Sequence, residues 1–192
     1  ADLDLIDDKE RLKGLVDSIE ENKYECIDGK KRLTAAKKLS ENKEMLAAVC
    51  AAVQTGIPYM AECGGFMYLQ EKLITADGKE YPMAGVITGV CEKKERLIRF
   101  GYVTIEPEQG QEGLLRQGEQ IRGHEFHYFD STNNGCDCIA GKPIGKRSWT
   151  CIHADRSHFI GFPHLYYPSC PDFVINFVEQ CRNWNRKRKG AK

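Results

Sequence analysis

The sequence predicts an α/β fold in which a central sheet is extended by antiparallel strands. Residues 57–61 form a short apolar run that stops at Cys-Gly-Gly, residues 63–65, and an amphipathic stretch over residues 66–73 begins at once. This order is typical of a buried strand, a sharp turn and a helix. After residue 83, segments that mix β-branched or aromatic residues with polar ones indicate several strands. A strand–helix unit followed by several strands and a last helix is the pattern of an α/β protein.

Two helices and a linker are expected before the apolar run. Residues 7–22 place their aliphatic side chains on one side of a helix. Residues 24–38 are polar and basic and contain an Asp-Gly turn signal, so we expect a linker or irregular structure there. Ser40 is a suitable N-cap for a second helix that extends to about Gln54.

Five strands and a closing helix are expected in the second half of the chain. The strands are expected at residues 83–88, 97–105, 119–128, 149–153 and 158–164. Pro171 suits the first turn of a helix that extends to about Arg186, because an N–H in the first turn has no intrahelical acceptor anyway. Apolar residues at helical spacing give this helix a stripe that can pack on the sheet.

Length, charge and cysteine content exclude several classes of protein. The 192 residues are enough for one domain with a core, or for one domain plus an appendage. The 28 basic and 28 acidic side chains balance, so the charge indicates no nucleic-acid partner. We expect neither a membrane span nor a secretory signal. Nine irregularly spaced cysteines favour a reducing, cytoplasmic environment, and the start at Ala1 suggests a piece of a longer protein.

Cys63 is the main candidate for a catalytic residue. A cysteine at a turn between a strand and a helix lies near the helix N-terminus, which stabilises the nucleophilic thiolate. Gly64 and Gly65 remove the Cβ atoms that would crowd such a turn. These residue types in this order predict a nucleophile elbow with cysteine in place of serine. The alternative is a small buried apolar residue, as most free cysteines are.

A thiolate nucleophile needs a base, and spacing along the chain does not select one of the five histidines. His164 ends an expected strand, at a position where ligand crevices form in open α/β sheets. Residues 122–128 are a second cluster, in which strand alternation places His124 and Glu125 on opposite faces. This cluster could orient an imidazole against a carboxylate or bind an anion through Arg122. The alternative is a polar strand edge.

Three blocks of the sequence together resemble one family. They are Ala-Glu-Cys-Gly-Gly-Phe-Met-Tyr-Leu at 61–69, Arg-Gly-His-Glu-Phe-His-Tyr at 122–128 and Gly-Phe-Pro-His-Leu-Tyr-Tyr-Pro at 161–168. In this order they look like the class I glutamine amidotransferase domain of cobyrinic acid a,c-diamide synthase. The resemblance spans about residues 39–183 and implies a flavodoxin-like sheet with added antiparallel strands. It implies that residues 39–192 form this domain and that residues 1–38 are a helix and linker ending an upstream nucleotide-binding domain.

The resemblance implies a role for each matched residue. Cys63 matches the nucleophile that attacks glutamine, His164 matches the base, and the Gly64 N–H is an oxyanion donor. In the full-length enzyme, ammonia from glutamine would amidate ATP-activated carboxylates of a corrinoid, with magnesium. No cofactor and no metal site are expected in this chain itself.

The second block supplies weaker candidates for substrate binding. Arg122, His124 and Tyr128 would contact the corrinoid carboxylates or the domain interface, and the sequence leaves both readings open. Many related amidotransferases carry a glutamate two residues after the catalytic histidine, but here that residue is Tyr166. Glu125 is therefore the candidate to orient the histidine.

The sequence departs from the family's pattern before residue 40. The family's domain opens with strands and a Gly-Gly-Tyr-Pro-Glu-like loop that supplies a second oxyanion N–H, and residues 27–36 match neither. Losing one oxyanion donor lowers a rate roughly a hundred- to thousand-fold. Missing strands would expose a sheet edge and favour a homo-oligomer. The chain has no Gly-x-x-x-x-Gly-Lys-Ser/Thr loop, so ATP is not expected to bind here.

Other functions stay open at this point. The domain could supply ammonia to another acceptor, as in cobyric acid synthase. It could instead be a non-catalytic binding or assembly module, or an elbow-cysteine peptidase of a related fold. A zinc site built from Cys136, Cys138, Cys151 and His153 would have suitable ligand types at an unusual spacing. The basic residues 186–189 are expected to be a solvated end of the chain.

Overall fold

The computed structural model describes residues 28–190, with side chains from residue 34 onward. Residues 36–192 form one compact unit, and the description below concerns this unit and residues 28–35, which precede it. The helix expected at residues 7–22 lies outside the described residues.

The helix α2 (Asp28–Glu41) forms where the sequence predicted a linker, so that prediction is wrong. The segment is rich in lysine, alanine and leucine, which are strong helix formers. Its Asp-Gly pair lies in the first turn, where an aspartate is favourable, and not in a loop. High helix propensity along the segment therefore outweighs one turn signal.

The helix α3 (Lys43–Gln54) is the one expected from residue 40, but its N-cap is Asn42. The Asn42 side chain accepts a hydrogen bond from the Met45 N–H at 3.0 Å, which satisfies a donor of the first turn. The Ser40 hydroxyl instead donates to the Lys37 carbonyl of α2 at 2.7 Å. Although α3 is largely apolar, none of its residues is buried.

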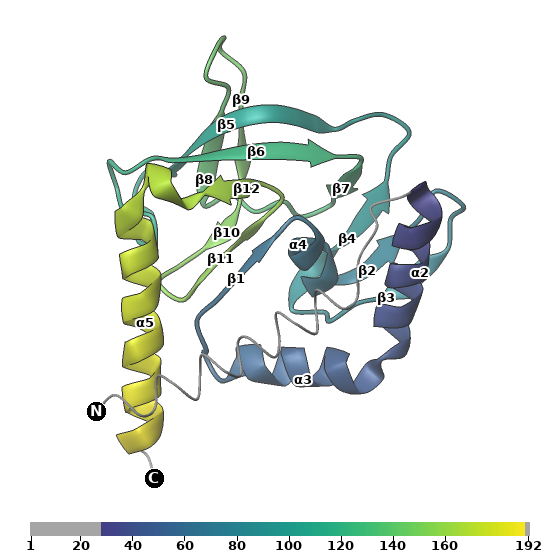
Figure 1. Cartoon of the computed structure of the whole chain (residues 1–192), viewed down its shortest axis with the longest axis horizontal. Helices are drawn as coiled ribbons and strands as arrows, with labels where there is room; N and C mark the ends of the chain where they lie inside the picture. The colour runs from purple at the N-terminus through teal and green to yellow at the C-terminus, as the bar shows by residue number, and fades with distance from the viewer. Residues whose placement is uncertain (1–27, 191–192) are drawn as a thin grey trace. The chain divides into compact units, whose positions relative to one another are not determined.

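The sheet that positions Cys63 has three strands in the order β1-β11-β10 (Figure 1). The strands β1 (Tyr59–Glu62) and β11 (His158–Gly161) are parallel, and β10 (His153–Ala154) is antiparallel to β11. The helix α4 (Gly64–Leu69) follows β1 directly, so the expected order of strand, turn and helix is confirmed. Among the described residues, β1 is an edge strand of this sheet.

Two further sheets complete the unit. A five-stranded antiparallel sheet has the order β12-β6-β5-β8-β9, and a four-stranded sheet has the order β3-β2-β4-β7, with β2 and β4 parallel. Their strands are β2 (Gln70–Ile74), β3 (Glu80–Pro82), β4 (Ile87–Lys93), β5 (Arg99–Pro107), β6 (Ile121–His127), β7 (Phe129–Ser131), β8 (Cys138–Gly141), β9 (Ser148–Cys151) and β12 (His164–Tyr166). The mixed α/β character agrees with the predicted fold class.

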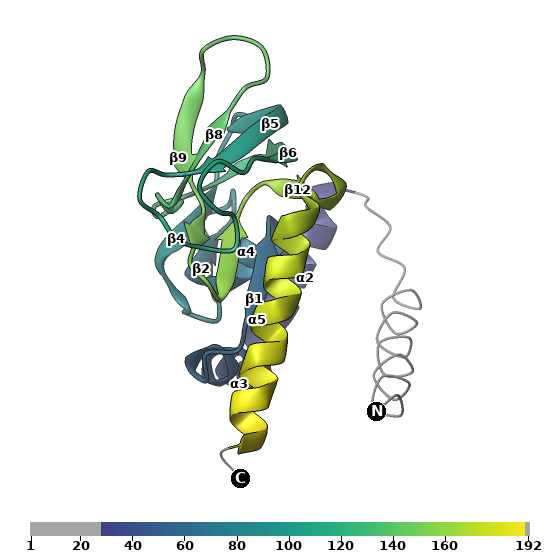
Figure 2. The ribbon, with the colours of Figure 1, turned by 90° about the vertical axis from the view of Figure 1, so that its left-hand side faces the viewer.

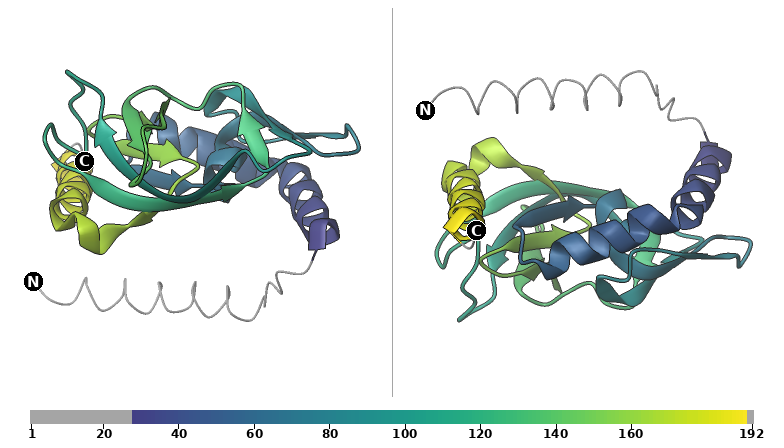
Figure 3. Two further views of the ribbon diagram at one scale, coloured as in Figure 1. Left: turned by 90° about the horizontal axis from the view of Figure 1, so that it is seen from above. Right: turned by 90° about the horizontal axis from the view of Figure 1, so that it is seen from below.

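The short 3-10 helix η1 (Tyr167–Ser169) and the helix α5 (Pro171–Gly190) close the described chain, and α5 is where the sequence predicted it. From the end of β12, α5 descends towards the level of α3 (Figure 2). Seen from below, α3 lies on the side of the unit away from the five-stranded sheet (Figure 3). None of the helices in residues 28–190 is long and apolar enough to cross a membrane.

Two clusters of buried apolar side chains join these layers. One cluster includes Ile105 of the five-stranded sheet and Phe173 of α5. The other includes Phe66 of α4 and Phe162, which follows β11. Phe66 and Phe162 pack edge to face with their ring centroids 4.9 Å apart. The helix after the cysteine is thereby fixed against the segment that follows β11.

Several strands lie where the sequence predicted a helix or no element. The helix expected over residues 66–73 ends at Leu69, and β2 replaces its second half. The sequence of β2, Gln-Glu-Lys-Leu-Ile, does not favour a strand by itself. Its pairing with both β3 and β4 decides the conformation, because strand preference depends strongly on the neighbouring strands.

The turn between β10 and β11 depends on one carboxylate. Asp155 Oδ1 accepts hydrogen bonds from the Ser157 hydroxyl at 2.8 Å and from the His158 N–H at 2.9 Å. Burial by itself would raise the pKa of Asp155, but the hydrogen bonds from Ser157 and the nearby His158 outweigh burial and hold the pKa below its ordinary value.

Replacing Asp155 by asparagine should therefore lower the free energy of unfolding by about 0.5–1 kcal/mol at neutral pH, because the half-exposed carboxylate is screened by water. A carboxylate with a depressed pKa stabilises the fold above its unfolded-state pKa, and this contribution is lost as the pH falls through the folded-state pKa. The difference between parent and Asp155→Asn should therefore shrink below the ordinary aspartate pKa of 3.8. Urea unfolding at neutral and acidic pH measures this, with the exposed Glu179→Gln as control. A constant difference across pH would contradict the assignment.

Candidate functional site

Cys63 lies between β1 and α4 in a strained backbone conformation, with φ 47° and ψ −102°. A positive φ is costly for a residue with a side chain and is common at functional sites. Hydrogen bonds hold the turn in place. The Cys63 N–H donates to the Gly161 carbonyl of β11 at 2.8 Å, and the Cys63 carbonyl accepts from the Met67 N–H at 3.0 Å. The half-buried sulfur is therefore carried on a fixed elbow.

The two glycines after the cysteine have different surroundings. A Cβ atom on Gly65 would lie 3.3 Å from the Ala61 Cβ, so glycine allows α4 to approach β1 closely. A Cβ atom on Gly64 would meet nothing within 4 Å, so the backbone there faces open space. The Gly64 N–H belongs to the first helical turn, whose N–H groups have no intrahelical acceptor.

His164 is brought to the elbow by the pairing of β1 with β11. Glu62, the last residue of β1, lies opposite Gly161, the last residue of β11. Only Phe162 and Pro163 separate Gly161 from His164, the first residue of β12. The His164 side chain is 54% exposed, so a substrate can reach the imidazole.

A carboxylate that the sequence analysis did not single out lies beside His164. Glu62 Oε2 is 3.6 Å from His164 Nδ1. The same oxygen accepts a hydrogen bond from the Leu165 N–H at 3.3 Å, and Glu62 Oε1 accepts one from the Tyr167 hydroxyl. Burial, and next the hydrogen bond to Glu62, raise the pKa of Tyr167, so the phenol stays protonated and donates. The residue directly before the nucleophile thus contacts the predicted base.

One protein family matches most of this chain. A family model of the CobB/CobQ-like glutamine amidotransferase domain matches residues 4–153. The chain belongs to this family. The match confirms the expected resemblance, although it begins before residue 39 and ends before the block that contains His164.

Curated relatives of this amidotransferase domain are cobyrinate a,c-diamide synthases. The protein of Caldanaerobacter subterraneus is 34% identical over 154 residues, which cover 79% of this chain and 34% of the relative. The protein of Listeria innocua is 37% identical over 145 residues, which cover 73% of this chain and 31% of the relative. The chain therefore spans about a third of the length of the curated relatives that it matches.

Glu125 does not contact His164 in this amidotransferase domain, so the expectation that it orients this histidine is wrong. In the pairing of β12 with β6, His164 lies opposite His124, and neighbouring residues of a strand point to opposite faces. The Glu125 side chain therefore points into the interior, where it is only 2% exposed, and its Oε1 lies 3.4 Å from His127 Nε2.

The other predicted residues of the second block lie on or beside the exposed face of the five-stranded sheet. Arg122 and His124 are on this face, and the Arg122 N–H donates to the Ser169 hydroxyl at 2.8 Å. Tyr128 follows β6, and Lys93 Nζ lies 4.3 Å from its ring centroid. Large exposed side chains of the same face are Phe100, Tyr102, Phe126 and Tyr166. The aromatic face thus adjoins His164, which shares β12 with Tyr166.

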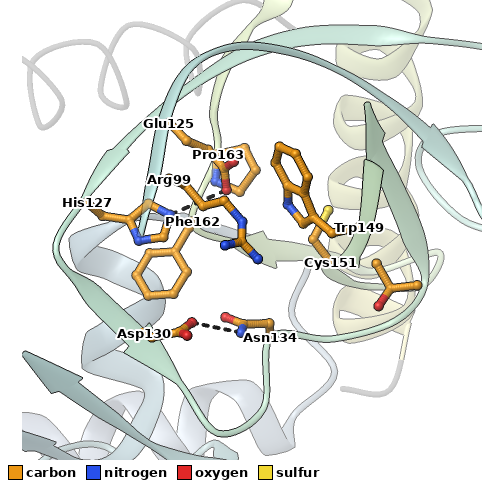
Figure 4. A pocket seen from close by; sticks show the side chains of 10 residues that line it. Arg99, Glu125, His127, Asp130, Asn134, Trp149, Cys151, Phe162 and Pro163 are labelled. Atoms are coloured by element: carbon orange, nitrogen blue, oxygen red, sulfur yellow. Dashed lines mark hydrogen bonds and ion pairs between the residues drawn. The ribbon is translucent and has the colours of Figure 1, made fainter. Parts of the chain in front are cut away.

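Glu125 lines a small polar cavity instead (Figure 4). Its Oε2 atom and Asn134 Oδ1 are buried without a hydrogen-bond partner among the described residues. The Arg99 guanidinium lies in the middle of the group, 4.8 Å from the ring of Trp149. The cavity of about 20 Å³ has room for one water-sized molecule. In this conformation the cavity has no room for a free amino acid such as glutamine.

The cysteines considered as zinc ligands are mostly buried. Cys138 and Cys151 lie opposite each other on β8 and β9, whereas Cys136 is exposed. Burial raises the pKa of the Cys138 thiol and raises that of Cys151 to about 12, so both are thiols at neutral pH. Among the residues that the structure describes, no group of three or more His, Cys, Asp or Glu side chains could hold a metal ion.

Proposed function

We propose that this chain is the glutamine-hydrolysing part of a cobyrinate a,c-diamide synthase, with Cys63 as nucleophile and His164 as general acid and base. The observation that carries the proposal is the strained elbow at Cys63, joined by the pairing of β1 and β11 to the segment that bears His164. Membership of the amidotransferase family supplies the substrate class, a terminal carboxamide.

The proposed chemistry needs two steps at Cys63. The thiolate attacks the side-chain carbonyl carbon of glutamine, and the C–N bond breaks as His164 gives a proton to the leaving ammonia. A γ-glutamyl thioester remains on the sulfur. His164 then takes a proton from water, the hydroxide attacks the thioester, and the C–S bond breaks to release glutamate. The Gly64 N–H stabilises the oxyanion of each tetrahedral intermediate.

The acceptor and the partners belong to the proposal for the whole enzyme. The curated relatives are named cobyrinate a,c-diamide synthases, so the acceptor proposed here is a corrinoid carboxylate. ATP and magnesium would bind in the part of the enzyme that the relatives have in addition. Arg122, His124 and Tyr128 would contact the acceptor or that ATP-binding part, in a cytoplasmic enzyme.

Two observations support a flavodoxin-like sheet that lacks its first strands. Among the described residues, β1 has a partner on one side only, although elbow strands usually lie within a sheet. In the apolar helix α3, Leu46 and Val49 pack against a core cluster but are only partly buried, so among the described residues nothing covers the rest of the helix. Without the glycine-rich loop, one of two oxyanion donors is absent, and the rate falls roughly a hundred- to thousand-fold. The uncovered edge favours self-association, which sedimentation measures.

The proposal is tested with the purified chain and glutamine. We expect slow release of glutamate and ammonia, no release of aspartate from asparagine, and covalent labelling of Cys63 by the diazoketone analogue of glutamine. Peptide mapping by mass spectrometry locates the label. A label on Cys136, the exposed thiol of the described residues, with Cys63 unmodified would overturn the proposal. A folded chain that releases no glutamate and is not labelled at Cys63 would favour the second candidate, a non-catalytic assembly module. The observation that favours this candidate is the apolar helix α3, none of whose residues is buried.

A further inference from the structure

A catalytic histidine needs a group that fixes its orientation and its tautomer. In cysteine and serine triads a carboxylate accepts the proton on one ring nitrogen, so that the other nitrogen faces the nucleophile. Tyr166, two residues after His164, has no carboxylate, and its side chain is 59% exposed. Glu125 contacts His127 on the other face of the sheet. Neither residue can orient His164.

Glu62 has the geometry that this role requires. Its Oε2 atom lies 3.6 Å from His164 Nδ1, within the range of an ion pair and longer than a hydrogen bond. Catalytic hydrogen bonds are often long in ligand-free structures and tighten when substrate binds. The side chain is 25% exposed, so water only partly screens the carboxylate.

The carboxylate is held by donors at both oxygens. The Leu165 N–H donates to Oε2 at 3.3 Å, and the Tyr167 hydroxyl donates to Oε1. Both donors come from the segment that carries His164, and this ties the end of β1 to β12 and η1. Two donors leave the carboxylate group little freedom to rotate, and its Oε2 stays directed at the imidazole.

We propose that Glu62 is the positioning residue for His164, so that the orienting acid directly precedes the nucleophile in the chain instead of following the histidine. This inference rests on the proposed function. Glu62 holds a proton on His164 Nδ1, which leaves Nε2 to exchange protons with the Cys63 sulfur, the leaving ammonia and the attacking water. One strand end then supplies both the nucleophile and the acid that orients its base.

The parent protein gives the first test. Long-range nitrogen–proton NMR distinguishes the two tautomers of a neutral imidazole. At a pH where His164 is neutral, we expect the proton on Nδ1. The signal is assigned by its loss in His164→Ala. A neutral His164 that carries its proton on Nε2 would overturn the proposal without any change to Glu62.

Glu62→Gln gives the second test, because it removes the charge and nearly keeps the shape of the side chain. Its single amide oxygen can accept from the Leu165 N–H or from the Tyr167 hydroxyl, which now bind different oxygens. We expect a mixture of tautomers at His164 and a fall in kcat of roughly a hundred-fold or more with little change in KM. Loss of a triad carboxylate lowers kcat roughly ten-thousand-fold, and the smaller effect is expected because Glu62 is partly exposed. Glu71→Gln is the matched control, since Glu71 also accepts a backbone N–H, from Gly89 at 2.9 Å, and belongs to β2. It should leave tautomer and kcat unchanged.

The outcomes separate this inference from the proposed function. An unchanged tautomer and an unchanged kcat in Glu62→Gln would overturn the role of Glu62 while hydrolysis by Cys63 stands. If the parent releases no glutamate, the proposed function fails, and the NMR test still decides whether Glu62 orients His164.

Tyr167→Phe is the second variant, for the case that Glu62→Gln does not fold. It removes one of the two donors to the carboxylate, and we expect a smaller shift of the tautomer equilibrium of His164 in the same direction. An unchanged tautomer in this variant, with the parent proton on Nε2, would overturn the proposal.

Discussion

Replacing Cys63 by serine should lower the rate of glutamine hydrolysis roughly a thousand-fold or more. The two side chains have nearly the same shape, so the elbow and its hydrogen bond from the Cys63 N–H to the Gly161 carbonyl should persist. A serine hydroxyl, however, does not ionise near neutral pH. The oxyanion donor proposed at Gly64 cannot replace a thiolate that attacks the carboxamide carbon. Glutamate release is measured at saturating glutamine, and labelling by the diazoketone analogue should disappear in parallel.

Cys136→Ser is the control for this variant, because Cys136 is the exposed thiol among the described residues. It should keep the parent rate and lose only a site that reacts with a general alkylating agent. Circular dichroism and the unfolding midpoint should be the same for parent and both variants. Hydrolysis by Cys63→Ser at the parent rate would mean that Cys63 is a strained structural residue and that another group performs the reaction.

The elbow could be predicted from the sequence because it depends on neighbouring residues. An apolar run, a small nucleophilic residue and two glycines are what a tight strand-to-helix turn requires, and they are adjacent in the chain. The observed φ of 47° at Cys63 agrees with that local requirement. The family's blocks likewise pointed to the strand that carries His164.

The group that contacts His164 could not be predicted in the same way. Glu62 reaches the imidazole because β1 pairs in parallel with β11, which places Glu62 opposite Gly161. Glu125 does not reach the His164 imidazole, because the pairing of β12 with β6 places His124, and not Glu125, opposite His164. Both relations depend on the register of strands that are distant in sequence, and a shift of one residue would exchange the two faces. One signal was present, since Glu62 belongs to the same block as Cys63.

The largest effect on stability is expected from Gly135→Ala. Gly135 has φ +80° and forms a bridge to Ile152, which itself has φ 68°. A Cβ atom at Gly135 would lie 2.2 Å from both the carbonyl carbon and the carbonyl oxygen of Ile152. These are backbone atoms, so no change of side-chain rotamer relieves the overlap. We expect the free energy of unfolding to fall by about 3 kcal/mol or more, because a strained backbone and a steric clash add.

Gly118→Ala separates the two causes. Gly118 has nearly the same backbone conformation, φ +85°, but a Cβ atom there would meet nothing within 4 Å. Gly118→Ala should therefore lower the free energy of unfolding only through backbone strain, by about 1–2 kcal/mol. The additional loss of unfolding free energy in Gly135→Ala then measures the contact with Ile152. The Ile152 side chain lies against Gly161, and the Gly161 carbonyl accepts the hydrogen bond from the Cys63 N–H. We also expect the diazoketone analogue of glutamine to label Cys63 more slowly in Gly135→Ala than in the parent, and at the parent rate in Gly118→Ala. Equal losses of stability in the two variants would show that the bridge yields easily and does not support the elbow.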